Sequence, residues 1–187
     1  MCGIVGILGS QPVAPLMLDA LRRLEYRGYD SAGIATLEDG ELMRQRAPGK
    51  LKNLKGVLAS RPLGGTTGIG HTRWATHGAP TENNAHPHTA KGVAVVHNGI
   101  IENFHELRVE LEQAGSDFET ETDTEVIVQM ISHELTAGKS PAGAVQATLK
   151  RLDGAFALGI IFSGEQDLMI GARRGSPLAI GHGETEM

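Results

Sequence analysis

The fold class is decided by residues 122–162, which read TDTEVIVQMISHELTAGKSPAGAVQATLKRLDGAFALGIIF. Apolar residues recur at helical spacing from Thr122 to Leu135, and Ser140-Pro141 begins another helix that we expect to run to Leu152. A β-rich apolar run, Ala155 to Phe162, comes next. Two helices in near succession do not fit the regular strand–helix alternation of a doubly wound parallel sheet. The stretch therefore favours an α+β fold.

The sequence on either side places more strands towards both ends of the chain. Asp39-Gly40 is a strong turn signal and predicts a β-hairpin. The Gly-, Thr-, His-, Asn- and Pro-rich residues 64–92 predict a long functional loop. We expect strands at 3–8, 32–37, 41–46, 93–96, 155–162, 168–172 and 178–180, and helices at 12–24, 50–60, 102–113, 122–135 and 141–152. Two antiparallel sheets with helices outside follow from this grouping.

Composition narrows the class of protein and of partner. The 187 residues, 40% hydrophobic and 21% charged, suit one globular domain, and no apolar run is long enough to predict a membrane partner. The net charge of -5 and the scattered 17 Lys and Arg argue against nucleic acid. We therefore expect a small-molecule partner. The single cysteine and the lack of a basic leader indicate a cytoplasmic location.

The single cysteine stands at position 2, where chain ends usually fray. Loss of Met1 would give Cys2 a free α-amine, with a pKa of roughly 7.7 to 8.0, which could take the proton from the thiol. Cys2 would then be a nucleophile that carries its own base. The alternative is a small apolar residue that opens a strand.

Attack on an amide carbonyl creates an oxyanion that needs fixed N–H donors. Asn98-Gly99, expected at the end of the 93–96 strand, offers a side-chain amide and a backbone N–H. The alternative is a hairpin turn, because Asn-Gly is the commonest sequence in such turns. The helix expected after Gly99 weakens that alternative.

Two charged residues suit the two ends of an amino acid. Arg73 could bind a carboxylate through two hydrogen bonds, and Trp74 could cover the site. A surface Arg beside a core Trp is an equally good interpretation of these two residues. Asp123 could bind an ammonium group. From the residues alone, Thr122 to Glu125 is more simply a helix cap with an acidic first turn.

Metal and nucleotide sites are not favoured. The histidines contain no HExxH arrangement, and Cys2 supplies the one thiolate. The run from Gly64 to Gly70 fits neither dinucleotide-binding nor P-loop spacing. We expect no metal and no cofactor. The histidines considered are His71, His77, His86, His88 and His97.

Five stretches together resemble one known family. They are CGIVG at 2–6, EYRGYDSAG at 25–33, HTRWATHG at 71–78, HNGIIE at 97–102 and ETDTE at 121–125. In this order, over essentially the whole chain, they are similar to the N-terminal glutaminase domain of the glucosamine-6-phosphate synthase family. That domain is a class II glutamine amidotransferase of the N-terminal-nucleophile hydrolase superfamily. The YRGYDSAG and TRWATHG forms resemble this family more than its purine-pathway or asparagine-synthesising relatives.

The resemblance implies a four-layer α/β/β/α sandwich over residues 2–187 and a role for each matching residue. Cys2 would be the nucleophile, Asn98 and Gly99 the oxyanion hole, and Arg73 and Asp123 the groups that hold L-glutamine. A loop around Trp74 would close over the substrate, and the Cys2 thioester would be hydrolysed to glutamate. Residues that would shape the pocket are Thr76, His77 and Arg27.

The resemblance also sets limits on the activity we expect. In the family, ammonia passes to C-terminal sugar-isomerase domains that act on fructose 6-phosphate, and those domains are absent here. The chain is also expected to lack the last sheet residues of the glutaminase domain, which would leave apolar surface exposed. Full-length relatives are expected to be homo-oligomers. Two alternatives stay open: a stand-alone amidohydrolase of the same superfamily, and an inactive remnant.

Overall fold

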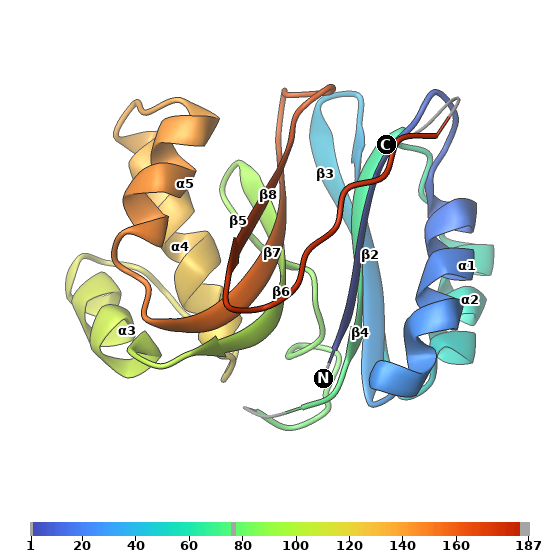
Figure 1. Ribbon diagram of the computed structural model, residues 1–187, viewed down its shortest axis with the longest axis horizontal. Helices are drawn as coiled ribbons and strands as arrows, with labels where there is room; N and C mark the ends of the chain where they lie inside the picture. The colour runs from blue at the N-terminus through green and yellow to red at the C-terminus, as the bar shows by residue number, and fades with distance from the viewer. Residues whose placement is uncertain (1, 76–77, 184–187) are drawn as a thin grey trace.

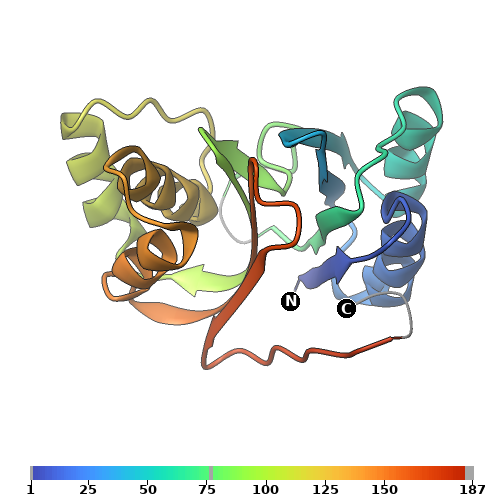
Figure 2. The same cartoon turned by 90° about the horizontal axis from the view of Figure 1, so that it is seen from above.

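The computed structural model describes residues 2–75 and 78–183. Within these residues the strands form two four-stranded antiparallel sheets, and helices cover the outer face of each sheet (Figure 1). The view from above shows the resulting order of layers, helices, sheet, sheet and helices (Figure 2). This arrangement confirms the predicted α+β four-layer sandwich.

The first sheet carries the N-terminal strand and two covering helices. Its strand order is β1-β4-β2-β3, and Asp39 and Gly40 form the predicted hairpin turn with φ of 51° and 83°. The helices pack apolar side chains, Met17 and Leu54 among them, onto the outer face of the sheet. The elements are β1 (Gly3–Leu8), α1 (Ala14–Leu24), the 3-10 turn η1 (Glu25–Arg27), β2 (Ser31–Glu38), β3 (Glu41–Pro48), α2 (Leu51–Ser60) and β4 (Thr67–Arg73).

The second sheet carries the longer helical layer. Its strand order is β5-β6-β7-β8, and the central pair β6 and β7 is in register from Val93 with Phe162 to Ile101 with Gly154. The largest apolar cluster of the described residues lies between this sheet and its helices. The elements are β5 (His88–Ala90), β6 (Val93–Ile101), α3 (Phe104–Gln113), α4 (Asp123–Thr136), α5 (Pro141–Leu149), β7 (Gly154–Phe162) and β8 (Met169–Arg174).

A smaller apolar cluster joins the inner faces of the two sheets. Ala35 and Ile69 of the first sheet pack against Ala94, Val96 and Ile161 of the second. These side chains are small or β-branched, which lets the two sheets pack face to face. None of the described helices is long and apolar enough to cross a bilayer.

The long loop predicted at residues 64–92 is wrong for two segments. Residues 88–90 form β5, and residues 67–73 form β4 in the interior of the first sheet. Composition misled here because the glycines of β4 serve packing. A Cβ at Gly68 would lie 2.8 Å from Sδ of Met17, and one at Gly70 would lie 3.0 Å from its Cε. The missing side chains leave the space that Met17 of α1 fills.

Several predicted boundaries also need correction. The first helix begins at Ala14 and not at Pro12, and the helix opened by Ser140 ends at Leu149 and not at Leu152. No strand forms at residues 178–180, which follow Pro177. Thr122 stands at the N-cap of α4 as predicted, but its side chain makes no cap hydrogen bond.

Candidate active site

Residues of both sheets meet at one end of the sandwich. Cys2 and Arg73 on one side, and Gly99 and Asp123 on the other, line the same cavity of ≈ 20 Å³. That volume holds about one water molecule. These four predicted site residues and a fifth, Trp74, are therefore neighbours in space. The cavity lining is completed by Trp74, His86, His97, Thr122 and Thr124.

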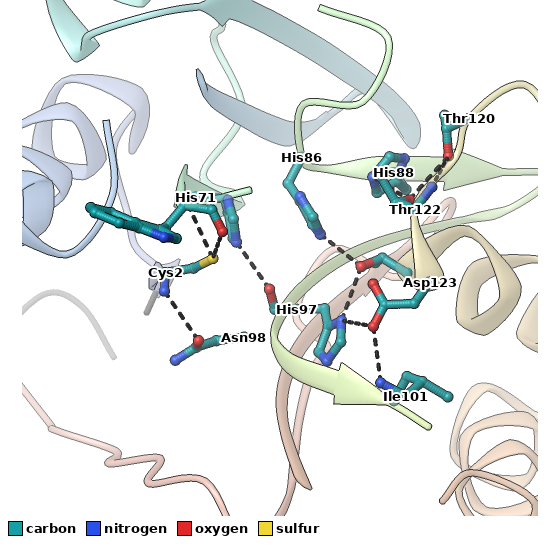
Figure 3. Close-up of polar contacts among 12 residues, drawn as sticks. Cys2, His71, His86, His88, His97, Asn98, Ile101, Thr120, Thr122 and Asp123 are labelled. Carbon is teal, nitrogen blue, oxygen red and sulfur yellow. Dashed lines mark hydrogen bonds and ion pairs between the residues drawn. The ribbon is translucent and has the colours of Figure 1, made fainter. Parts of the chain in front are cut away.

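Cys2 lies directly before β1, and the pairing of Gly3 with Thr72 sets it beside the end of β4. Its backbone nitrogen donates to Oδ1 of Asn98 at 3.2 Å (Figure 3). The Trp74 N–H donates to Sγ at 3.4 Å, and the Trp74 carbonyl oxygen lies 3.6 Å from Sγ. Burial raises the pKa of the Cys2 thiol, and the Trp74 N–H opposes that shift only in part. Cys2 therefore needs a base before it can attack a carbonyl carbon.

Asn98 and Gly99 lie inside β6, where Asn98 pairs with Ala157 of β7 and Gly99 with Phe156. The hairpin-turn alternative is therefore wrong, and so is the expectation that the strand ends before this pair. Gly99 has a φ of 149°, and a Cβ there would come within 2.1 Å of the Ala155 carbonyl oxygen. Only glycine fits this position. Because Oδ1 of Asn98 accepts from Cys2, the Nδ2 end of the same amide is left to donate.

Arg73 is the last residue of β4 and is almost fully buried. Its Nη1 donates to the Ala79 carbonyl oxygen at 3.2 Å, and Nη2 donates to that of Gly78 at 3.1 Å. Burial lowers the pKa of Arg73, while the nearby Asp30 carboxylate raises it. Two N–H groups of the guanidinium thus fix its plane. A guanidinium held in this way is suited to paired hydrogen bonds with a carboxylate.

Asp123 is the first residue of α4 and is buried. Its Oδ2 accepts a hydrogen bond from the backbone N–H of Ile101 at 2.9 Å and lies 3.8 Å from Nδ1 of His97. These contacts turn the carboxylate towards the cavity rather than towards the helix end (Figure 3). As the residue pattern predicted, Asp123 lies in the acidic first turn of α4, but its carboxylate also accepts from the Ile101 N–H. A buried carboxylate in this place can hold a substrate ammonium group.

The segment that carries Trp74 is held by the residues after η1. Oδ2 of Asp30 accepts from the Ala75 N–H, and the Asp30 N–H donates to the Arg73 carbonyl oxygen at 3.1 Å. The Tyr29 ring meets the Trp74 ring edge-on, with centroids 5.5 Å apart. Trp74 is 48% exposed, which does not fit a core tryptophan. The sequence patterns did not indicate Asp30, although it lies in the YRGYDSAG stretch.

Three predicted pocket residues are not placed in the cavity. Thr76 and His77 lie outside the described residues. Arg27 belongs to η1, is half-buried, and is not among the residues that line the cavity. The predicted roles of these three residues stay predictions.

Four buried imidazoles lie at the cavity, and the sequence had raised them only as metal ligands. His86 and His97 line the cavity, and His71 and His88 lie against His86. The rings of His71 and His86 stack at 4.0 Å, and those of His86 and His88 meet edge-on at 4.6 Å. Nε2 of His71 donates to the His97 carbonyl oxygen at 2.9 Å. Sequence spacing alone does not indicate this cluster, because β4, β5 and β6 bring its members together only in the folded chain.

Burial keeps His71, His86 and His88 uncharged. It lowers the pKa of His71 to about 3, and it also lowers the pKa values of His86 and His88 well below their ordinary range. Among residues 2–75 and 78–183, no three His, Cys, Asp or Glu side chains are arranged to hold a metal ion. Neutral imidazoles serve here as hydrogen-bonding groups.

A larger cavity of ≈ 310 Å³ lies elsewhere between the sheets, against residues 178–181. Its walls are apolar side chains such as Ile4, Val96 and Leu158. No titratable side chain lines it, so it offers no groups for acid–base or nucleophilic chemistry. The small cavity at Cys2 is therefore the candidate active site.

Comparison with known proteins identifies the family of the chain. Residues 71–185 match the model of a family described as a glutamine amidotransferase domain. The glutamine--fructose-6-phosphate aminotransferase [isomerizing] of Bradyrhizobium diazoefficiens is 66% identical over 187 residues, and that of Mesorhizobium japonicum is 63% identical. Each match covers 100% of this chain but 31% of the relative. The chain thus spans about a third of the length of these curated relatives.

Solved structures share the fold. The glutamine phosphoribosylpyrophosphate amidotransferase from B. subtilis, complexed with ADP and GMP, superposes with a TM-score of 0.79 at 28% identity. That match covers 92% of this chain and 37% of the other. A structure described as the allosteric regulatory enzyme of purine biosynthesis gives a TM-score of 0.75, also at 28% identity, over 86% of this chain and 35% of the other.

Proposed function

The chain belongs to the glutamine amidotransferase domain family, and from that premise we propose that it is the glutamine-hydrolysing part of a glutamine:fructose-6-phosphate aminotransferase. The observation that carries the proposal is the convergence of Cys2, Arg73, Gly99 and Asp123 on one cavity, with Asn98 bonded to Cys2. These groups supply a nucleophile, two donors for an oxyanion and one partner for each charged end of glutamine.

The first chemical step is proton transfer from the Cys2 thiol. Removal of Met1 converts the backbone nitrogen of Cys2 into an α-amine, and Oδ1 of Asn98, 3.2 Å away, orients that amine. Because burial raises the pKa of the thiol, the amine acts as the base that generates the thiolate. Sγ then attacks the carboxamide carbon of glutamine and forms a tetrahedral intermediate.

The oxyanion of that intermediate is stabilised by N–H donors that are already in place. Nδ2 of Asn98 and the backbone N–H of Gly99 are the proposed pair. The protonated amine returns its proton to the leaving nitrogen, and the C–N bond breaks to release ammonia. Water then hydrolyses the Cys2 thioester, so that glutamine and water give glutamate and ammonia. Asn98 thus acts at both of its ends, on the base through Oδ1 and on the oxyanion through Nδ2.

Recognition of glutamine rests on the two charged residues. The Arg73 guanidinium pairs with the α-carboxylate, and the Asp123 carboxylate pairs with the α-ammonium group. A cavity of ≈ 20 Å³ is far smaller than glutamine, so substrate entry requires the residues around it to move. The segment at Trp74 and Ala75, which is held through Asp30, is the part we propose to open and then close over the substrate. The roles of Thr76, His77 and Arg27 in the pocket are part of the same proposal.

The proposed domain extends beyond the matched residues 71–185 to include Cys2, the proposed nucleophile, and the strand β1 that holds Cys2 beside the end of β4. The reaction needs no cofactor, and its nucleophile must stay a free thiol, which suits the reducing cytoplasm. Delivery of ammonia to fructose 6-phosphate, and any homo-oligomer, would depend on the parts of the relatives that this chain does not span.

The test is mass spectrometry of the purified protein before and after treatment with 6-diazo-5-oxo-norleucine, a glutamine-like alkylating agent. We expect Met1 to be absent, one adduct to map to Cys2, and glutamine to protect against labelling. Cys2→Ser should take up no label. An exposed but unlabelled Cys2 would contradict the proposal and favour the inactive alternative.

A second variant tests the base. An alanine inserted between Met1 and Cys2 places a peptide bond where the proposal requires an amine, so glutamine hydrolysis should be lost. The far-ultraviolet circular dichroism and the melting temperature should match those of the parent protein, because only the chain end is changed. Retained hydrolysis would show that another group, such as a histidine, is the base.

A further inference from the structure

Thr124 is a buried threonine in the first turn of α4, and its hydroxyl contacts two imidazoles at once. Oγ1 lies 2.8 Å from Nε2 of His86 and 3.0 Å from Nδ1 of His97. A hydroxyl has one hydrogen to donate, so it can donate to only one of the two rings, and the other ring nitrogen must carry a hydrogen of its own to bond to it. The protonation of the two rings is therefore coupled through Thr124.

The Asp123 carboxylate sets the direction of these two hydrogen bonds. Its Oδ2 lies 3.8 Å from the same Nδ1 of His97, and a negative charge at that distance favours an N–H on the facing ring nitrogen. His97 then donates to Thr124, and Thr124 donates to Nε2 of His86. The hydrogen bonds thus order three groups around the carboxylate rather than leaving the threonine free to rotate.

The residue on the other side of Asp123 is held in a similar way. Oγ1 of Thr122 lies 3.1 Å from Nε2 of His88. The Thr122 side chain makes no cap hydrogen bond to α4, so it is available for this contact. Asp123 is therefore flanked by two threonines that are bonded to rings contributed by residues 86 and 88, while its own carboxylate faces the cavity (Figure 3).

We propose that Thr124 is a positioning residue: by bonding His86 and His97 together, its hydroxyl holds the first turn of α4 where the Asp123 carboxylate can meet the ammonium group of glutamine. Thr124 touches no reacting atom, and its effect on the substrate passes through Asp123. The inference rests on the proposed function for the identity of the substrate, but the hydrogen-bond order is a property of the protein alone.

The variant test compares two reagents that attack the same sulfur. The diazo-oxo-norleucine reagent carries an α-ammonium group, whereas iodoacetamide does not. Thr124→Val keeps the shape of the side chain and removes the hydroxyl. It should slow labelling of Cys2 by the diazo-oxo-norleucine reagent at least about ten-fold, and change the rate of labelling by iodoacetamide less than about two-fold. Thr124→Ser restores the hydroxyl and should restore the first rate.

Two further variants make this comparison specific. Thr148 on α5 is equally buried, and its hydroxyl has no hydrogen-bond partner among the described residues, so Thr148→Val should leave both labelling rates unchanged. In an Asp123→Asn background, Thr124→Val should slow labelling by the diazo-oxo-norleucine reagent by less than about a further two-fold, because the carboxylate through which Thr124 acts is already gone. The proposal would be overturned if Thr124→Val slowed labelling of Cys2 by both reagents to the same extent, or slowed labelling by neither.

A measurement on the unaltered protein does not depend on how the variants fold. Nitrogen-15 NMR of the imidazoles should show the hydrogen on Nδ1 of His97 and none on Nε2 of His86. The reverse pattern would overturn the proposal whatever Thr124→Val does. If Cys2 of the unaltered protein resists the glutamine-like reagent but the rings have the expected hydrogens, the proposed function fails and the hydrogen-bond order stands.

Discussion

Helices α1 and α4 cover the outer faces of the two sheets, yet they are attached to them in different ways (Figure 1). Helix α1 buries Ala14, Met17 and Leu21 on one side and leaves Asp19 and Arg22 in solvent. Helix α4 buries residues all round, including the polar first turn from Asp123 to Glu125. Apolar packing alone accounts for the position of α1, whereas α4 is also fixed by hydrogen bonds that reach the cavity.

The difference separates residues that maintain the fold from residues that prepare the site. A one-sided apolar pattern needs only a sheet to pack on. A helix whose first turn is buried and polar must satisfy each of its polar groups. In α4 the partners are Ile101 for Asp123, His86 and His97 for Thr124, and Glu119 and Thr120 for Glu125. Changes in α1 should therefore affect stability, and changes at the start of α4 should affect substrate binding.

The largest effect is expected at Asp123. Asp123→Asn keeps an oxygen for the Ile101 N–H but removes the charge that the substrate ammonium group needs. We expect kcat/KM for glutamine to fall by about 10² to 10³, which is about 3 to 4 kcal/mol of transition-state stabilisation. Steady-state glutamate production checks the fall, and the midpoint of urea unfolding should barely move. A large loss of stability without a kinetic effect would reverse the contrast between the two helices.

The next effect is expected in α1. Met17 is fully buried over Gly68 and Gly70 of β4, and Met17→Ala leaves a cavity there. The free energy of unfolding should fall by about 3 kcal/mol, as measured by urea denaturation. The KM for glutamine should stay within about two-fold of the parent value in the molecules that remain folded. A strong rise in KM would show that α1 also prepares the site.

The dependence of stability on pH should distinguish the two regions as well. Burial lowers the pKa values of His71, His86 and His88, so below pH ~6.5 the unfolded chain binds protons that the folded chain does not. Each histidine then costs up to about 1.4 kcal/mol of stability per pH unit as the pH falls, and for His71 this continues towards pH about 3.

His88→Gln removes one of these histidines, so the free energy of unfolding should fall less steeply with decreasing pH, by the contribution of one histidine. Urea unfolding at several pH values between 7 and 5 measures the slope for the variant and for the parent protein. Met17→Ala supplies the contrast, because it should lower stability by the same amount at every pH. Identical slopes for His88→Gln and the parent would mean that His88 is protonated in the folded protein too.

The smallest effect is expected on the exposed side of α1. Arg22 and Asp19 form an ion pair with an N to O distance of 3.1 Å, and both side chains are largely in solvent. Asp19→Ala should change the free energy of unfolding by less than about 0.5 kcal/mol, because water and salt screen such pairs. The same urea measurement, repeated at high salt, checks the result, and a larger change would indicate a partner at this surface.

The sequence predicted most elements, and the errors have physical causes. The turn at Asp39-Gly40 and the apolar faces of α1 and α4 follow from local chemistry, so they were found. Strand β4 was missed because Gly68 and Gly70 read as loop residues until Met17 is placed against them. The extension of β6 through Asn98 and Gly99 was missed because a local pattern cannot show that β7 pairs along its full length.

The candidate site was predictable to a different degree. Motif resemblance indicated Cys2, Arg73 and Asp123, and the structure places all three on one cavity. Residue type alone placed Asp123 in the acidic first turn of a helix, which is correct, but a sequence does not show that its carboxylate accepts from the Ile101 N–H or that Asp123 lines the cavity. The contacts of Thr124 with His86 and His97 join residues far apart in the chain, and neither periodicity nor spacing encodes them.

The cavity is lined from both halves of the sandwich, by Cys2, Arg73 and Trp74 on one side and by residues such as Gly99 and Asp123 on the other. This gives the protein an internal measure of its own folding. A glutamine-like reagent needs Cys2 from one half and Asp123 from the other, so it labels only molecules in which the two halves have joined. The labelled fraction would therefore count correctly assembled molecules in a mixed preparation. Titration of the nucleophile during refolding would report when the sandwich closes, which total helix or strand content does not.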